Sequence, residues 1–520
     1  MSAMIDPLRD GPVVAERPQP GAPRTYDFPA VTSRTLANGL SVLVVNLPGR
    51  PLVSAAMILR GGVAEEPMDL AGATVMAARA LSEGTEAYDA IALVEASERL
   101  GASIHAEAGW DAFSVGVDVP ADRLTAAMEL VAEVLLRPTF PASEVERLRD
   151  ERLNDLLQAQ ADPRRRVEEA FVGTIYAPSS PYHRPSGGTR TTVERLTSED
   201  LRATYERTLH PSRATLVVGG DLSGQDVFAL AQRLFGAWSG APTAVPDAPS
   251  PSIADDGSPV GRVIRVIHRP GSVQTEIRIG HRGLSRRIPD FHAVSVMSAI
   301  LGGLFNSRLN MKLREEKGYT YGAGAGFDMR RGAGPFSARA AVNTEVTVPA
   351  ILETLAELTR MRETPVDETE LAAARDFLIG VFPLRFETAG AVVGALGGLA
   401  VHGLDVDELI DYRAHIEAVD GSAVAAAARE HLHVEDAAIV LVGDADAFLE
   451  ALEATGLGPI VIERDEVVPT AGPIDAAILP GSVDDEDETG PTAGTEEPDL
   501  PGNAGGPAAA DLSPDDAVTD

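Results

Sequence analysis

Hydrophobic positions along the first half of the chain alternate between strand-like and helical periods. The alternating segment 33–46 carries the hairpin turn signal Asn38-Gly39, and a strand-like apolar run follows at 52–62. Hairpin-connected strands mixed with helix pairs predict an α+β fold, a largely antiparallel sheet with helices on one face. The further segments are helical patterns at 70–82 and 86–101, strands within 102–120, and helical patterns at 124–136 and 143–160.

The second half repeats signals of the first at a nearly constant offset. ATLVVGGDL at 214–222 matches AAIVLVGDA at 437–445, which places Asp221 and Asp444 223 positions apart. ASEVERLRDERL likewise matches ETELAAARDFLI, with Asp150 and Asp376 226 positions apart. A repeat of this length predicts two homologous domains, because solenoid repeats are only about 20–50 residues long.

Composition divides the chain into five segments. The stretch near residue 250 is crowded with Pro, Ala, Ser and Gly, and the last 50 residues carry 13 acidic residues without Lys or Arg. Such a tail buries too little apolar surface to offset its ordering entropy. The predicted segments are a flexible arm at 1–25, a first domain at 26–239, a linker at 240–261, a second domain at 262–460 and a disordered acidic tail at 471–520.

Charge and cysteine content narrow the classes of partner and chemistry. The 78 acidic against 44 basic residues give a net charge of −34, which argues against nucleic acid or an anionic membrane as a partner. The absence of Cys excludes disulfides, thiolate zinc and a cysteine nucleophile. No apolar run approaches the roughly 20 residues of a membrane helix. We therefore expect a cytoplasmic protein.

The sequence resembles the insulinase/pitrilysin family of zinc peptidases, specifically its two-domain, processing-peptidase-like class. The resemblance extends over nearly all of 32–460 and is carried by the order of several segments. It implies two homologous domains that face each other across a substrate chamber, in agreement with the repeat. The segments are LANGLSVLVV, GATVMAARALSEGT, PYHRPSGGT, HRPGSVQTEIRIG and ILGGLFNSRLNMKLREEKGYTYG.

The resemblance also implies where zinc chemistry would lie, and the chain lacks the residues for it. The family holds zinc with two His of an H-x-x-E-H helix, whose Glu is the general base. The matching positions here are Val75, Ala78 and Arg79, and the third ligand position falls at Asp155. One carboxylate is short of the three protein ligands of a catalytic zinc site. We therefore expect no metal or cofactor bound by this chain.

The ten histidines supply no substitute zinc motif. No two of them stand four residues apart with a carboxylate between. His431 and His433 are interpreted as surface residues at a helix end, where the helix dipole favours His.

Paired glycines occur at 302–303 and 397–398 without the neighbours that a phosphate loop requires. Close packing of helices explains them better.

The chain does keep two other residues that the resemblance implies to be functional. By resemblance, Arg314 and Tyr321 in LREEKGYTY match an Arg and a Tyr of the second domain that reach the scissile peptide bond across the chamber. Both side chains are donors that can stabilise a developing oxyanion. Tyr319 competes for the aromatic role but fits the spacing less well. The structural alternative is that Arg314 only pairs with a neighbouring carboxylate and Tyr321 only packs at a strand start.

Together these observations predict a peptidase-family subunit that is inactive alone. Its partner would be an H-x-x-E-H paralogue that carries zinc, and Arg314 and Tyr321 would complete the partner's site for peptide hydrolysis. One alternative is a non-catalytic scaffold or peptide-binding homologue, and another is an enzyme with a metal site of a different kind.

Overall fold

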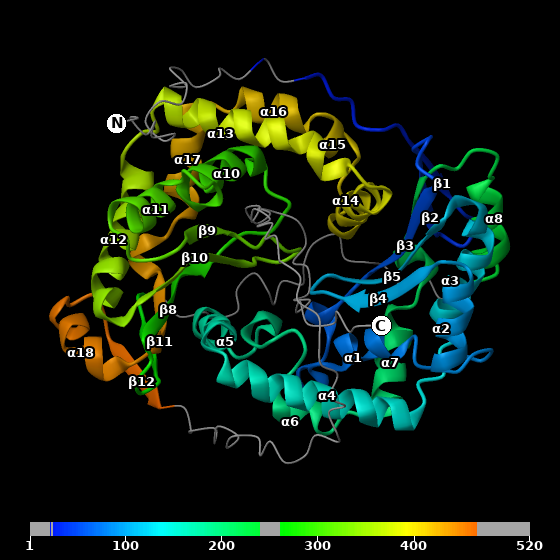
Figure 1. Ribbon diagram of the computed structural model, residues 1–520, viewed down its shortest axis with the longest axis horizontal. Coiled ribbons are helices and arrows are strands. Elements are labelled where there is room, and N and C mark those ends of the chain that lie inside the picture. Colours follow the sequence, from blue (N-terminus) through cyan, green and yellow to red (C-terminus); the bar gives the residue numbers. More distant parts are fainter. Residues whose placement is uncertain (1–20, 22–23, 240–260, 465–520) are drawn as a thin grey trace, which may run out of the picture.

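Two six-stranded mixed sheets and their helices make up the part of the chain that the structure describes. The computed structural model describes Gly21 and residues 24–239 and 261–464, and Figure 1 shows the elements arranged around the centre of the view. The expected tail, nearly all of the expected linker and most of the expected arm lie outside these residues.

The first sheet has the strand order β1-β2-β6-β3-β5-β4. The predicted hairpin is confirmed, because β1 pairs antiparallel with β2 and Gly39 adopts φ +94° in the turn between them. Only the β2 and β6 pair is parallel. The strands are β1 (Val31–Thr35), β2 (Ser41–Asn46), β3 (Leu52–Arg60), β4 (Ser103–Ala108), β5 (Ala112–Pro120) and β6 (Ala214–Gly220).

The second sheet has the order β12-β7-β11-β8-β10-β9 and repeats the first in five of its six strands. As in the first sheet, one parallel pair, β7 and β11, is followed by three antiparallel neighbours. The sheets differ at one edge, where β12 is parallel to β7. The strands are β7 (Ile264–His268), β8 (Gln274–Arg282), β9 (Ala323–Phe327), β10 (Pro335–Asn343), β11 (Ala438–Gly443) and β12 (Ile460–Arg464).

Helices follow the strands in both halves. In the first half they are α1 (Ala73–Ala80), α2 (Ala90–Arg99), α3 (Leu124–Leu136), α4 (Ala142–Ala161), α5 (Pro163–Ile175), α6 (Arg190–Val193), α7 (Ser198–Thr208) and α8 (Val227–Phe235). In the second half they are α10 (Phe291–Ser298), α11 (Arg308–Asn310), α12 (Thr347–Glu363), α13 (Glu368–Val381), α14 (Ala389–His402), α15 (Asp407–Ile410), α16 (Tyr412–Ala418), α17 (Gly421–His431) and α18 (Ala445–Ala454). Two segments are π-helical, Ala299–Gly303 and Met311–Glu316.

The two halves exchange one helix each. On one face of each sheet lie helices from its own half, as predicted, whereas the other face is covered by a helix from the opposite half. Helix α14 packs on β3 and β6, and α5 packs on β8 and β11. The two helices begin 226 positions apart, so the exchange follows the internal repeat. It explains why β11 is apolar throughout and why β6 is apolar except at the half-buried Thr215, since helices cover both faces of each sheet.

Polar caps and an ion pair with the buried Arg278 fix the two exchanged helices. Asp162 caps α5 by accepting hydrogen bonds from the N–H groups of Arg164 and Arg165. The buried Arg278 of β8 donates to Glu168 of α5 over 2.5 Å. Thr388 caps α14 in the same way, and α14 ends at Gly403, whose φ of +63° favours glycine.

Close approach of α14 to the first sheet depends on glycine. A Cβ at Gly397 would lie 3.3 Å from the side chain of Ile58 on β3, which confirms close packing for this glycine. The same holds for Gly302, where a Cβ would lie 2.1 Å from the backbone nitrogen of Ala325. At Gly398 the explanation is wrong, because no atom of the described residues lies within 4 Å of a Cβ there.

No single helix among the described residues is long and apolar enough to cross a membrane. Two consecutive helical segments are long and apolar enough only when they are taken together, and they meet at a bend of 113°. These segments are Glu368–Phe386 and Ala389–His402.

We expect Gly397→Leu to lower the free energy of unfolding by about 1–3 kcal/mol, because the added side chain has no room against Ile58. Gly394→Leu is the matched control on the same helix, since among the described residues no atom lies within 4 Å of a Cβ at that position. The control should be neutral or stabilise by up to about 1 kcal/mol through helix propensity. Urea unfolding measures both, and equal destabilisation by the two variants would contradict the packing argument.

Candidate functional site

The positions that match the family's zinc ligands lie on two packed helices, α1 and α4. The buried carboxylate of Glu66 fixes the start of α1 by accepting hydrogen bonds from the N–H groups of Gly72 and Thr74, over 2.9 and 2.6 Å. Arg184 donates to the same carboxylate over 2.9 Å and is itself buried. Arg184 belongs to the PYHRPSGGT segment, so this segment holds α1 in place.

Arginine side chains occupy the surroundings of the degenerate zinc positions. Arg79 on α1 donates to Glu151 of α4 over 2.9 Å. On α4, Asp155 accepts from Arg165 over 2.8 Å and also from Arg152. Burial alone would raise the pKa of Asp155, but hydrogen bonding to Arg165 and the charges of both arginines outweigh it and lower the pKa.

These residues do not fit a zinc ion. Val75 offers a hydrocarbon side chain, and Ala78 is a buried methyl group in the place of the general base. The only carboxylate of the set, Asp155, is already bonded to two guanidinium groups. The positive charge of arginine therefore takes the place of the metal's charge, and the general base is missing as well.

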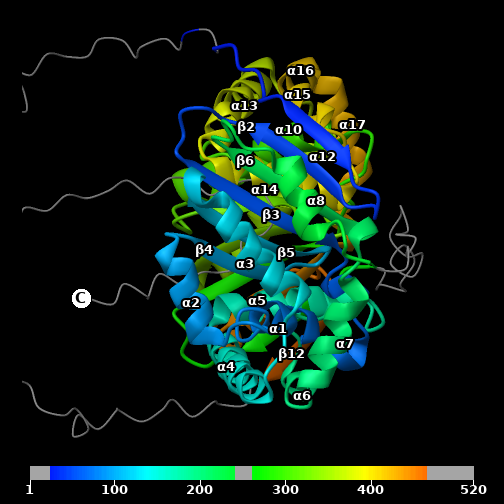
Figure 2. The same ribbon diagram turned by 90° about the vertical axis from the view of Figure 1, so that its right-hand side faces the viewer.

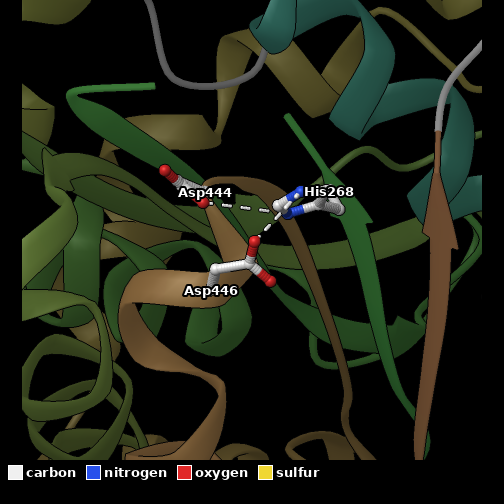
Figure 3. Close-up of side chains that lie close together, drawn as sticks. All are labelled: His268, Asp444 and Asp446. Carbon is white, nitrogen blue, oxygen red and sulfur yellow. Dashed lines mark ion pairs between the residues drawn. The ribbon is translucent and has the colours of Figure 1, made fainter. Parts of the chain in front are cut away.

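Figure 3 shows a different group with metal-ligating side chains, His268, Asp444 and Asp446, at the start of α18. The His268 ring lies between the two carboxylates, 3.8 Å from an oxygen of each. Its Nδ1 accepts a hydrogen bond from the N–H of Ala445 over 3.1 Å. The neutral ring then carries its proton on Nε2, so neither nitrogen offers a lone pair to a metal.

The internal repeat gives Asp444 a structural role. Its carboxylate accepts the N–H of Gly271 over 2.8 Å, just as Asp221 accepts the N–H of Gly49 over 3.1 Å in the first half. Both aspartates fix the turn that follows the equivalent strands β7 and β2. This group therefore does not support a metalloenzyme of a different kind.

The prediction for His431 is wrong. His431 is buried at the end of α17, and its Nε2 lies 2.7 Å from a carboxylate oxygen of Asp290. The spacing of Val424, Ala427, Ala428 and His431 places all four on the buried face of the helix, which is the signal that sequence analysis missed. His433 is exposed, as predicted.

Arg314 and Tyr321 lie in the second half, on the segment between α11 and β9. Arg314 is in the π-helical segment Met311–Glu316, and π-helices are rare and often found at functional sites. Its guanidinium pairs with Glu315 at 3.3 Å and lies 4.7 Å from the centre of the Phe305 ring. Arg314 therefore makes the ion pair that a purely structural role for it predicts.

Tyr321 does not pack at the strand start. Its side chain is 93% exposed, and no hydrogen bond or ring contact holds it within the described residues. Tyr319 is half-buried against the core of the second half. Exposure thus distinguishes the two tyrosines, and Tyr321 is the one available to another molecule.

The two candidate regions lie apart in the molecule. Figure 1 places α4 along the bottom of the view with α1 just above it, whereas α11 and β9 lie at the upper left, and Figure 2 likewise shows α1 and α4 in the lower part of the molecule. The structure therefore does not bring the Arg314 segment to the chain's own α1.

Comparison with known proteins identifies the family to which this chain is related. Residues 41–183 match the family described as insulinase (peptidase family M16), and residues 195–378 match the description peptidase M16 inactive domain. The chain belongs to the insulinase family. The predicted family is confirmed in both halves.

Relatives of this insulinase-family chain differ in what their names say about activity. It is 25% identical over 365 residues to an uncharacterized zinc protease of Mycobacterium tuberculosis, across 70% of this chain and 82% of the relative. It is 22% identical over 345 residues to the non-peptidase homolog YmxG of Helicobacter pylori, across 65% and 76%. It is 25% identical over 289 residues to a probable mitochondrial-processing peptidase subunit beta of Schizosaccharomyces pombe, across 54% and 60%.

Solved structures share the insulinase-family fold. The crystal structure of a peptidase M16 inactive domain from Pseudomonas fluorescens has a TM-score of 0.72 and 25% identity, over 79% of this chain and 98% of that one. A protease from Helicobacter pylori has a TM-score of 0.74 and 21% identity, over 80% and 100%. Together with the two sheets described above, these likenesses confirm the predicted fold class.

We expect the isolated chain to hold less than about 0.1 zinc ion per chain after dialysis and not to cleave unstructured peptides. Three ligands are needed to offset the cost of desolvating and ordering a zinc site, and only Asp155 has a ligating side chain. Elemental analysis of the purified protein measures this. About one tightly held zinc per chain would contradict the account of the α1 and α4 region.

Proposed function

We propose that this chain is the metal-free subunit of a cytoplasmic two-subunit insulinase-family peptidase. Its partner would be a paralogue with an H-x-x-E-H helix that binds zinc, and this chain's second half would supply Arg314 and Tyr321 to the partner's site. The observation that carries the proposal is the exposure of Tyr321 beside Arg314 on a π-helical segment, in a chain whose own α1 lacks every zinc ligand.

A purely structural role accounts for Arg314 in part but not for Tyr321. The partly exposed ion pair of Arg314 with Glu315 contributes about 0–1 kcal/mol, and its contact with the Phe305 ring adds about 0.5–1 kcal/mol. An aromatic ring that is fully in water contributes nothing to the core. Tyr and Arg are among the residue types that contribute most to binding at recognition surfaces. The names of two relatives are consistent with a pair of one metal-free and one zinc-binding subunit, since one is a non-peptidase homolog and another is a processing-peptidase subunit.

In the proposed complex the two side chains act as hydrogen-bond donors. The guanidinium of Arg314 and the phenol of Tyr321 would bond the oxygen of the scissile peptide carbonyl. That oxygen gains negative charge as water adds to the carbonyl carbon, so both bonds strengthen in the transition state and accelerate the chemical step. The zinc and the general base belong to the partner.

A non-catalytic role in peptide binding is the second candidate, and the edge strand β4 favours it. Within the described residues, strand β4 pairs with β5 alone, and its residues Ser103, His105 and Glu107 are exposed. A peptide in extended conformation can add to such an edge through main-chain hydrogen bonds. In that case the chain would hold a peptide without contributing to its cleavage.

Substitution of the pair separates the two candidates. In a complex with the unaltered H-x-x-E-H paralogue, we expect Arg314→Ala or Tyr321→Phe to lower kcat by about 10²–10³, the usual effect of losing one oxyanion donor. Arg314→Lys should restore little activity, because Lys keeps the charge without the planar fork. Steady-state peptide hydrolysis measures kcat, and size-exclusion chromatography and zinc analysis check that the complex is intact.

Arg429→Ala is the matched control, because Arg429 is an exposed arginine of the same half on α17. It should leave kcat unchanged. If the Arg314 and Tyr321 variants cleave peptide as fast as this control, the pair takes no part in catalysis and the chain is a scaffold or peptide-binding subunit.

A further inference from the structure

A polar pocket lies between α11, α12 and the start of α13, next to the segment that carries Arg314. It has a volume of about 450 Å³, and Arg308, Met311, Glu357 and Glu370 are among its lining residues. We propose that this pocket binds the primary carboxamide of a Gln or Asn side chain in a peptide. The binding itself does not depend on a catalytic role for Arg314 and Tyr321.

Arg308 supplies an unused hydrogen-bond donor to this pocket. Its side chain is buried, and its Nε and Nη2 donate to the two oxygens of Glu370 over 2.7 Å each. The remaining nitrogen, Nη1, is also buried and has no hydrogen-bond partner among the described residues. A buried donor without a partner costs free energy, which an acceptor atom of a ligand would recover.

Glu357 on α12 supplies an acceptor with spare capacity. Its side chain is only 6% exposed, yet within the described ranges its carboxylate accepts from a single group, Nη1 of Arg360, over 3.2 and 3.4 Å. The Arg360 side chain is 53% exposed, so water screens much of its charge. A carboxylate has about four acceptor positions, so Glu357 can accept a further donor from a ligand.

The charges of the lining favour a neutral ligand. Four glutamates line the pocket together with two arginines and one lysine, which leaves one net negative charge. The glutamates would repel a carboxylate ligand, whereas an ammonium or guanidinium ligand has no acceptor for Nη1 of Arg308. A primary carboxamide has a carbonyl acceptor and an NH₂ donor, so one neutral group can bond both Arg308 and Glu357.

The volume of the pocket agrees with a side chain of this size. Sites for small ligands have volumes of roughly 300–1,000 Å³. About 450 Å³ accommodates a Gln side chain with several waters, at roughly 30 Å³ per water. Met311, which is 45% exposed, provides an apolar wall for the methylene groups of the ligand.

Glu315 connects the pocket to the proposed catalytic pair. It lines the pocket and pairs with Arg314 at 3.3 Å. A peptide whose carbonyl is held by Arg314 can therefore place a neighbouring side chain in the pocket. In this last step, which rests on the proposed function, the pocket selects substrates with Gln or Asn close to the scissile bond.

Binding of short peptides to the full-length chain alone tests the proposal without the paralogue. The probes are pentapeptides Ala-Ala-Xaa-Ala-Ala, closed by acetyl and N-methylamide groups so that a Gln side chain supplies the sole primary carboxamide. We expect the Gln peptide to bind with a dissociation constant lower by about tenfold or more than those of the Glu, Lys and Met peptides, because these lack the donor, the acceptor or both. Titrations followed by saturation-transfer difference NMR measure the constants.

Two changes in the pocket should each weaken binding of the Gln peptide by about tenfold or more. Glu357→Met removes the acceptor at similar side-chain volume. Arg308→Met combined with Glu370→Met removes the donor together with its paired carboxylate, so no buried charge is left unpaired.

Matched controls alter α12 outside the pocket. They are Glu363→Met, at an exposed glutamate, and Arg362→Met combined with Glu435→Met, which removes an ion pair. Both should bind the Gln peptide as the unaltered chain does, and circular dichroism verifies that each variant is folded.

Three results would overturn the proposal. They are no binding of the Gln peptide to the unaltered chain, equally tight binding of the Glu, Lys or Met peptide, and folded pocket variants that bind like the controls. If a pocket variant does not fold, the peptide series on the unaltered chain still decides. None of these results bears on Arg314 and Tyr321, whose role is measured by kcat in the complex.

Discussion

The exchange of α5 and α14 between the two sheets is the constraint on which the rest of the structure depends. Each sheet buries one face under helices of its own half and the other under a helix from the opposite half. Without α14, the face of β3 and β6 that it covers would be exposed to water, and α5 protects β8 and β11 in the same way. Each half therefore needs the other to complete its core.

The same exchange positions the candidate functional region on α4. Helix α5 follows α4 directly, so its burial against the second sheet fixes α4 and the carboxylates of Glu151 and Asp155. Arg165 on α5 bonds Asp155, which ties the exchanged helix to the former zinc region. A change in the packing of α5 would therefore disturb the region around Asp155.

Much of the fold could be predicted from sequence because it depends on local patterns. The hairpin at Asn38-Gly39 and the offset between Asp221 and Asp444 were enough to predict strands and a duplicated domain. The absence of two zinc ligands at Val75 and Arg79 and of the general base at Ala78 follows from residue identity alone. Periodicity shows which face of a helix is buried but not which element covers it, so neither the exchange nor the burial of His431 against Asp290 was predicted.

Residues that act through distant partners were the hardest to predict. Arg184 and Glu66 are far apart in sequence, and neither pattern nor spacing shows that they meet beneath α1.

The central claim is that this chain completes an active site that it does not contain. Its most direct test is the rate of peptide hydrolysis by a zinc-loaded H-x-x-E-H paralogue as this chain is titrated into it. The account predicts a rate near zero for either protein alone and a rise that saturates at one chain per paralogue. Full activity of the paralogue alone, unchanged by added chain, would contradict it.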